Sequence, residues 1–200
     1  MPEHLKIEFI TRDVKGKVLS RVEHECHSFL TQYYQMMYVV TSPAYAVAGA
    51  TQAINDTGAA SRNFQVSAAA IRFFFCTQNG AASNVYGIQV GTGNAANTAA
   101  TSGLQTLIAD GVAATQLNYG AMGITVPSGS APLSFTFTRT FTNNSGGTIN
   151  VTEAGLVIAA SDTAGTQRNV MIIRDTGFGT VAILDGANST ATYTLSYTIA

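Results

Sequence analysis

The chain has 200 residues and a net charge of −1, and only 10% of its side chains are charged, whereas an average domain has about 25%. This length accommodates one domain with a sizeable core, and the near-zero charge removes the electrostatic basis for binding nucleic acid. The sequence has no run of 18 apolar residues, so we expect no membrane span. Residues 1–17 lack the apolar stretch of a signal peptide, so we expect a protein made in the cytoplasm without export.

The charged side chains are unevenly distributed. The first 30 residues carry ten ionisable side chains besides histidine, and the remaining 170 residues carry eleven. The long second part is built mainly from Thr, Ser, Asn, Gly, Ala and residues that favour strands. Because charged residues are depleted from the cores of interfaces, this composition is typical of a protein that works packed against copies of itself or a partner.

The N-terminal residues predict a strand followed by a helix. Residues 5–11 alternate between apolar and polar side chains, which indicates a strand, and Gly16 indicates a tight turn. Apolar residues then recur at spacings of three and four, which predicts an amphipathic helix over 18–39 that ends before Pro43. We interpret residues 1–43 as an arm whose helix docks on a partner. The candidate docking residues are Val18, Val22, Cys26, Phe29, Tyr33 and Met37.

Residues 44–200 predict a mainly β body. Short strand-like segments separated by Gly and Asn turns indicate an antiparallel β-sandwich or a jelly roll. Residues 104–108 are consistent with either a short helical turn or a strand. The expected strands are 64–75, 85–90, 133–141, 148–160, 170–175, 181–186 and 191–200.

Motifs for catalysis, metals or cofactors are absent from the sequence. His24 and His27 lie one helical turn apart, but no third ligand accompanies them, so we expect no metal site. The glycines of residues 91–93 lack the lysine of a phosphate-binding loop and indicate a turn. No serine nucleophile motif is present, and every histidine lies in the first 27 residues. We therefore expect no catalytic residue, no cofactor and no enzymatic activity.

We interpret three aspartates and the two cysteines as structural residues. Asp162, Asp175 and Asp185 lie at expected turns, where an aspartate accepts hydrogen bonds from the nearby backbone. Cys26 and Cys76 are 50 positions apart, without metal-ligand spacing, and we expect two buried free thiols, with a disulfide as the alternative.

Three charged residues lie inside segments that otherwise read as apolar or hydroxyl-rich strands. They are Arg139, Glu153 and Arg174, and Arg139 falls on the apolar side of its strand. Because buried charges are rarely left unpaired, we expect Glu153 to pair with Arg139 or Arg174 within the sheet. We interpret this cluster as structural, fixing strand register or an interface.

Several segments resemble structural proteins of tailed bacteriophages. The first is IQVGTGNAANTAATSGLQTLI at 88–108. The second is FTFTRTFTNNSGGTINVTEAGLVI at 135–158, which is followed by VMIIRDTGFGTVAILDGANSTATYTLSYTIA at 170–200. GKVLSRVEHECHSFLTQYYQMM, at 16–37, is similar to the helix that can precede this body. The resemblance implies a virion location, and it implies contacts with copies of the chain and with other virion proteins, such as the major capsid protein.

The sequence therefore predicts a non-enzymatic virion component, first of all a capsid cement or decoration protein acting through symmetric contacts. A neck or tail subunit is the alternative within the same class. A filament or pilus-like subunit completed by a neighbour's strand is the second class, and the expected absence of a signal peptide disfavours it. A carbohydrate-binding or hydrolytic β-sandwich is the third class. Exposed aromatic side chains would be its signature, and the chain has no Trp.

Overall fold

The structure is a computed structural model that describes residues 3–26, 29–41, 52–64, 80–125 and 133–197. Its largest element is a five-stranded sheet in which all neighbouring strands are antiparallel. The order across this sheet is β2 (Val18–Cys26), β1 (Glu3–Arg12), β12 (Asn188–Tyr197), β7 (Leu133–Thr142) and β6 (Asn118–Ile124).

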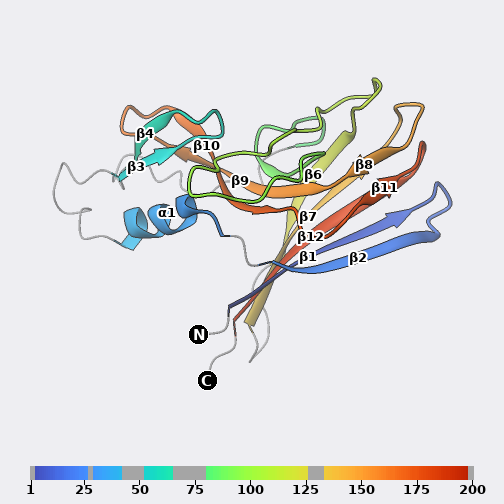
Figure 1. The fold of residues 1–200 in the computed structure, drawn as a ribbon, viewed down its shortest axis with the longest axis horizontal. Helices are drawn as coiled ribbons and strands as arrows, with labels where there is room; N and C mark the ends of the chain where they lie inside the picture. Colours follow the sequence, from blue (N-terminus) through green and yellow to red (C-terminus); the bar gives the residue numbers. More distant parts are fainter. Residues whose placement is uncertain (1–2, 27–28, 42–51, 65–79, 126–132, 198–200) are drawn as a thin grey trace.

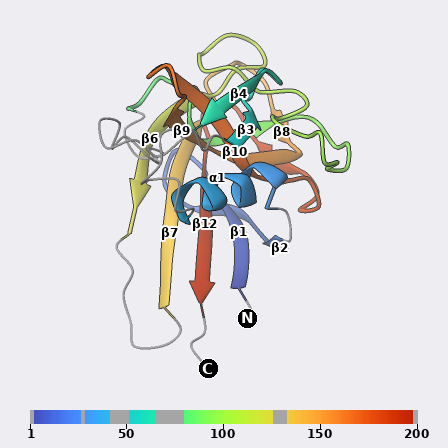
Figure 2. The ribbon, with the colours of Figure 1, turned by 90° about the vertical axis from the view of Figure 1, so that its left-hand side faces the viewer.

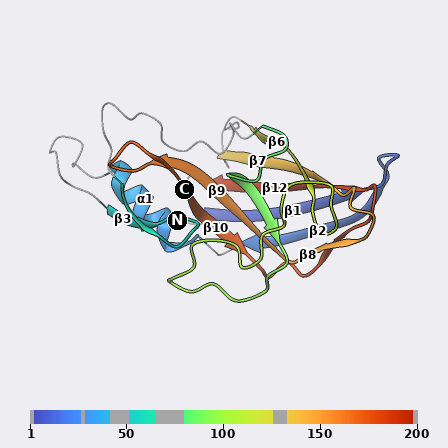
Figure 3. The same cartoon turned by 90° about the horizontal axis from the view of Figure 1, so that it is seen from above.

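A second layer lies over this sheet (Figures 1 and 3). It contains the three-stranded sheet β10 (Gln167–Asp175), β9 (Glu153–Ser161) and β5 (Gly87–Gly91). Two further pairs are β11 (Val181–Ile183) with β8 (Ile149–Val151), and β3 (Gln52–Asn55) with β4 (Ser61–Phe64). The helix α1 (Thr31–Thr41) lies beside the β3–β4 hairpin at one end of the molecule (Figures 1 and 2).

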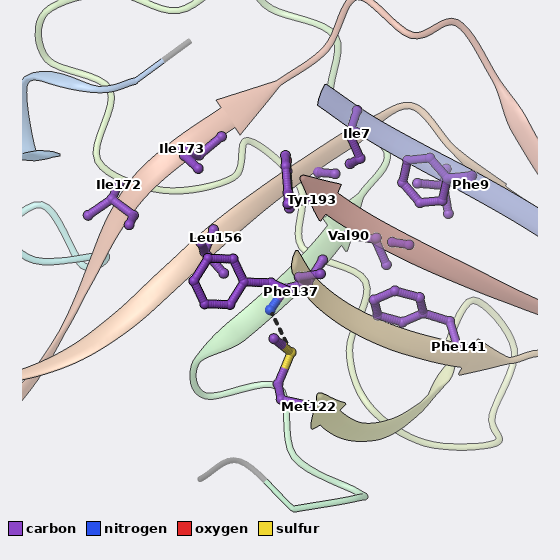
Figure 4. Close-up of a cluster of buried hydrophobic side chains, with 14 of the residues drawn as sticks. Ile7, Phe9, Val90, Met122, Phe137, Phe141, Leu156, Ile172, Ile173 and Tyr193 are labelled. Carbon is purple, nitrogen blue, oxygen red and sulfur yellow. Dashed lines mark hydrogen bonds between the residues drawn. The ribbon is translucent and has the colours of Figure 1, made fainter. Parts of the chain in front are cut away.

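The hydrophobic core lies between the two layers (Figure 4). Ile7, Phe9 and Tyr193 reach it from the five-stranded sheet, and Val90 and Leu156 reach it from the three-stranded sheet. Alternation along β1, β7 and β12 explains this arrangement, because every second side chain of a strand points to the same face. The mainly β, antiparallel, sandwich-like fold is thus confirmed, whereas the jelly-roll connectivity stays a prediction.

The helix predicted over 18–39 is wrong in its first half. Residues 18–26 form β2, which pairs with β1 through the turn at Gly16, and the helix described in this part of the chain covers 31–41. A spacing of four residues, as between Val18, Val22 and Cys26, fits a helix turn and also fits two strand repeats. The alternation along β2, with its even positions turned inward, is the feature that the prediction missed.

The predicted arm also differs from the observed arrangement. β1 is an inner strand that pairs with β12 on one side and β2 on the other. Glu3 lies opposite Tyr197, so both ends of the described chain join one sheet. Residues 3–26 therefore complete the body rather than extend from it. The predicted boundary at 43/44 lies outside the described residues, and the division into two domains stays a prediction.

Most of the other expected strands are present. The predictions at 85–90, 133–141, 148–160, 170–175, 181–186 and 191–200 correspond to β5, β7, β8 with β9, β10, β11 and β12. Residues 104–108 form neither a helix nor a strand and make one isolated bridge, between Leu107 and Gly91. Only Phe64 of the strand predicted at 64–75 is described, as the last residue of β4.

Candidate functional site

Glu153 is the first residue of β9, and its side chain is fully buried. Its Oε1 accepts hydrogen bonds from the backbone N–H groups of Gly93, at 3.0 Å, and Thr106, at 2.7 Å. Its Oε2 accepts the backbone N–H of Gln105 at 3.0 Å. These donors all belong to the irregular segment 92–106, so one carboxylate organises a loop that has no regular secondary structure of its own.

Arg174 on β10 is the charged partner of Glu153. Its Nε and Nη2 donate to Glu153 Oε2 at 3.0 and 2.8 Å, and its Nη1 donates to Ala95 O and Asn97 Oδ1 at 3.0 and 2.8 Å. Asn97 Nδ2 in turn donates to the backbone oxygen of Arg174 at 2.7 Å. The pairing predicted for Glu153 is therefore formed with Arg174. We call this cluster, Glu153 and Arg174 with segment 92–106, the carboxylate latch.

Two glycines make room for the latch. A Cβ atom at Gly91 would lie 2.5 Å from Glu153 Oε1, and one at Gly93 would lie 2.6 Å from the same oxygen. Both distances are far below van der Waals contact, so the carboxylate needs glycine at both positions. The sequence suggested only a turn at 91–93, and the spacing of these glycines gave no signal of a buried charge.

The electrostatics of the latch favour an ionised Glu153. Burial alone would raise the pKa of Glu153, but the N–H groups of Thr106, Gln105 and Gly93 and the Arg174 guanidinium together lower it below its ordinary value. A carboxylate held ionised, saturated with donors and closed to solvent is poorly suited to transferring protons to a substrate. This arrangement holds chain segments together.

Arg139 does not join the latch. It is buried on β7 and donates to the backbone oxygens of Gly120, at 2.8 Å, Tyr86, at 3.1 Å, and Ile88, at 3.2 Å, and also to that of Ser83. Its guanidinium carbon lies 4.8 Å from the centre of the Tyr119 ring. Burial lowers the pKa of Arg139 to about 10. Arg139 thus fixes residues 83–88 to the five-stranded sheet through carbonyl groups, and no carboxylate of the described residues forms an ion pair with it.

A third polar cluster lies in the core near the end of β10. Asp175 was expected at a turn, but it is the last residue of β10, where it is buried and accepts the Tyr193 hydroxyl at 3.1 Å. Burial, followed by the neighbouring Asp175 carboxylate, raises the pKa of the free, buried Cys26 thiol. Cys76 lies outside the described residues. Asp162 accepts two backbone N–H groups of its turn, as expected.

The six candidate docking residues are split between two elements. Val18, Val22 and Cys26 lie on β2, whereas Tyr33 and Met37 lie on α1. Phe29 lies between these elements, bridges to Ile173 and stacks on Tyr33 with ring centres 4.2 Å apart. They therefore form no single helical face. His24 also lies on β2, and His27 is outside the described residues.

The outward face of the five-stranded sheet has two chemically different halves. β2 and β1 carry the charged half: Lys6, Glu8, Arg12, Arg21, Glu23 and Glu25. β7 and β12 carry two half-buried rows of hydroxyls, which we call the hydroxyl face: Ser134, Thr136, Thr138, Thr140, Thr142, Thr190, Thr192, Thr194 and Ser196. The rows lie opposite each other in register, and Thr140 and Thr190 are hydrogen-bonded at 2.9 Å.

Within the described part of the chain, no group of three His, Cys, Asp or Glu side chains is placed to hold a metal ion. No described helix has the length and apolar character needed to cross a membrane. No protein-family model, no curated protein and no solved structure matches this chain.

Proposed function

We propose that this chain is a non-enzymatic structural subunit that works in a symmetric assembly, and that the assembly is a phage virion. The observation that carries the first part is the hydroxyl face, a regular two-strand surface without a charged side chain. A second subunit can pack against such a surface without the cost of removing water from ions. The motif resemblance supplies the virion setting.

The carboxylate latch supports a structural role from inside the molecule. The segments that resemble phage proteins contribute Gly91 and Gly93, then Glu153, and finally Arg174, and these four residues meet in one closed cluster. The hydrogen bonds and the ion pair of this cluster hold segment 92–106 against β9 and β10. A capsid cement or decoration protein fits this design best, because it needs a rigid body with uncharged contact surfaces.

The test places a charge in the centre of the hydroxyl face. Thr138→Arg should convert a discrete oligomer of the purified chain into a smaller species, measured by size-exclusion chromatography with light scattering, with unchanged circular dichroism. The control is Asn144→Arg, which adds the same charge on an exposed turn and should leave the native mass unchanged. A wild-type monomer, or a Thr138→Arg oligomer of wild-type mass, would overturn the proposed hydroxyl-face assembly. Open-ended polymers would favour the filament alternative.

A further inference from the structure

β2 is one of the two outer strands of the five-stranded sheet. At its opposite edge, Ala82 donates to Tyr119 of β6, and both edges of the three-stranded sheet are bonded in the same way, by Leu30 to Ile172 of β10 and by Ile108 to Val90 of β5. Residues 19–25 of β2 receive no such bond from any described segment. Among the described residues, β2 is therefore a nine-residue edge without a covering strand, and such an edge presents a row of donors and acceptors that another strand can complete.

The exposed side chains of β2 have a self-complementary order. Arg21, Glu23 and Glu25 point outward from the sheet, and the side chains of Arg21 and Glu23 are 63% and 47% exposed. Within one subunit Arg21 already pairs with Glu8, and Lys6 pairs with Glu23 at 2.8 Å. The charges are therefore held in defined positions while remaining open on the side of the free edge.

We propose that two copies of this chain pair antiparallel through β2, about a two-fold axis at Val22. The two five-stranded sheets then form one continuous sheet. This register pairs all nine residues of β2 and sets Arg21 opposite the partner subunit's Glu23, twice by symmetry. Opposite charges directly across antiparallel strands stabilise the pair, and like charges destabilise it.

Neighbouring registers set like charges opposite each other at the axis. Moving the axis by one residue to Arg21 sets Arg21 opposite the partner subunit's Arg21. Moving it to Glu23 sets two glutamates together, although Arg21 then faces the partner subunit's Glu25. The Val22 register also places Val18, which is 45% exposed, beside the partner subunit's Cys26 on the inward side. Charge and apolar burial therefore select the same pairing.

A charged edge strand has a competing explanation, because charged side chains on sheet edges can also prevent two edges from pairing. Charges that serve only to repel would be expected to share one sign. The two adjacent outward positions at the centre of β2, Arg21 and Glu23, have opposite signs, so they attract an antiparallel copy in the proposed register. The inference deepens the proposed function, because it names one self-contact, and it rests on that function only for its biological setting.

The experiment is a charge exchange in full-length protein that also carries Thr138→Arg, so that hydroxyl-face contacts are already removed. We expect this parent to be a dimer. Arg21→Glu and Glu23→Arg should each weaken dimerisation at least about tenfold, because each sets like charges opposite twice. The double variant should dimerise like the parent. A mixture of the two single variants should form a heterodimer, because the exchanged charges then face their opposites.

Sedimentation equilibrium measures each dissociation constant, and Lys15→Glu, on the exposed turn before β2, is the control for the change in net charge. Restoration in the mixture separates an interface effect from damage to the β1–β2 hairpin. A monomeric parent, single variants that dimerise as well as the parent, or a mixture that stays monomeric would overturn the edge pairing. A different result would overturn only the proposed hydroxyl-face function: Thr138→Arg leaves the native mass unchanged, while the Arg21 and Glu23 variants and their mixture dimerise as expected.

Discussion

Glu153 shows how a single buried charge can be compatible with a stable core. Removing a carboxylate from water is costly, and an ion pair alone often fails to offset the cost. Here three backbone N–H groups and two guanidinium N–H groups saturate both oxygens. The carboxylate therefore ties the two ends of segment 92–106 to the sheet, and Gln105 adds bonds within the segment by accepting the N–H groups of Asn94 and Ala95.

The first residue-scale prediction concerns the charge of Glu153. Glu153→Gln keeps the side-chain shape but leaves Arg174 charged and buried without its partner, which should lower the free energy of unfolding by about 3–5 kcal/mol. Urea denaturation measures this loss. Glu25→Gln, at an exposed glutamate, is the control and should change the midpoint little. A small effect of Glu153→Gln would contradict the latch.

The same variant predicts a pH dependence. The pKa of Glu153 is lower in the folded protein than its ordinary value, so its ionised form contributes stability that is fully present above about pH 4.3, its ordinary pKa. That stability is lost as the pH falls through the lowered, folded-state pKa. Urea midpoints measured between about pH 6 and pH 3 should therefore fall more steeply in wild type than in Glu153→Gln. Parallel curves would show that Glu153 is not the titrating group.

The second residue-scale prediction concerns the glycines of the latch. Gly93→Ala places a methyl group 2.6 Å from Glu153 Oε1 and 2.5 Å from Gln105 Cβ, which should cost about 1–3 kcal/mol through overpacking. Gly147→Ala is the matched control, because a Cβ there meets nothing within 4 Å. Thermal unfolding of the two variants side by side tests the difference, and equal melting temperatures would contradict it.

At the scale of elements, two hairpin loops share one design. In the β3–β4 and β9–β10 loops, an aspartate Oδ1 accepts two backbone N–H groups while its Oδ2 accepts an arginine Nε. The fourth residue of each loop has a positive φ, 60° at Ala59 and 76° at Gly165. The two loops therefore have the same local structure, but the position with positive φ is an alanine in one loop and a glycine in the other.

This difference predicts reciprocal effects in the two loops. Ala59→Gly should stabilise the protein and Gly165→Ala should destabilise it, each by about 1 kcal/mol, because only glycine adopts this backbone conformation without a Cβ penalty. Urea denaturation of the single variants and of the double variant tests the idea. Effects of the same sign in both loops would contradict it.

The elements also show which features the sequence could predict. β7 and β12 were predictable because their alternation extends over ten residues each. β2 was not, since its apolar spacing of four fits both a strand and a helix, and only pairing with β1 decides between them. The pairing of Glu153 with an arginine followed from the cost of buried charge, whereas its backbone donors at 93, 105 and 106 lie in a loop without periodicity.

At the scale of the whole molecule, the uneven charge of the sequence becomes two halves of one sheet face. The charged N-terminal residues occupy β1 and β2, and the hydroxyl-rich residues occupy β7 and β12 of the same sheet. The two proposed self-contacts therefore rest on different forces. Exposed ion pairs act at the β2 edge, and close packing with hydroxyl hydrogen bonds acts on the hydroxyl face.

Ionic strength should separate these two contacts. Charges near a protein surface are screened over about 10 Å at 0.1 M salt and about 3 Å at 1 M salt, so the β2 dimer of the Thr138→Arg protein should weaken as salt rises. The Arg21→Glu protein, which keeps the hydroxyl face, should instead retain its association at both salt concentrations, because no charged side chain lies on that face. Sedimentation equilibrium of the two proteins at both salt concentrations measures the contrast. Equal salt sensitivity would mean that one force governs both contacts, and the division of the sheet face would then have no role in assembly.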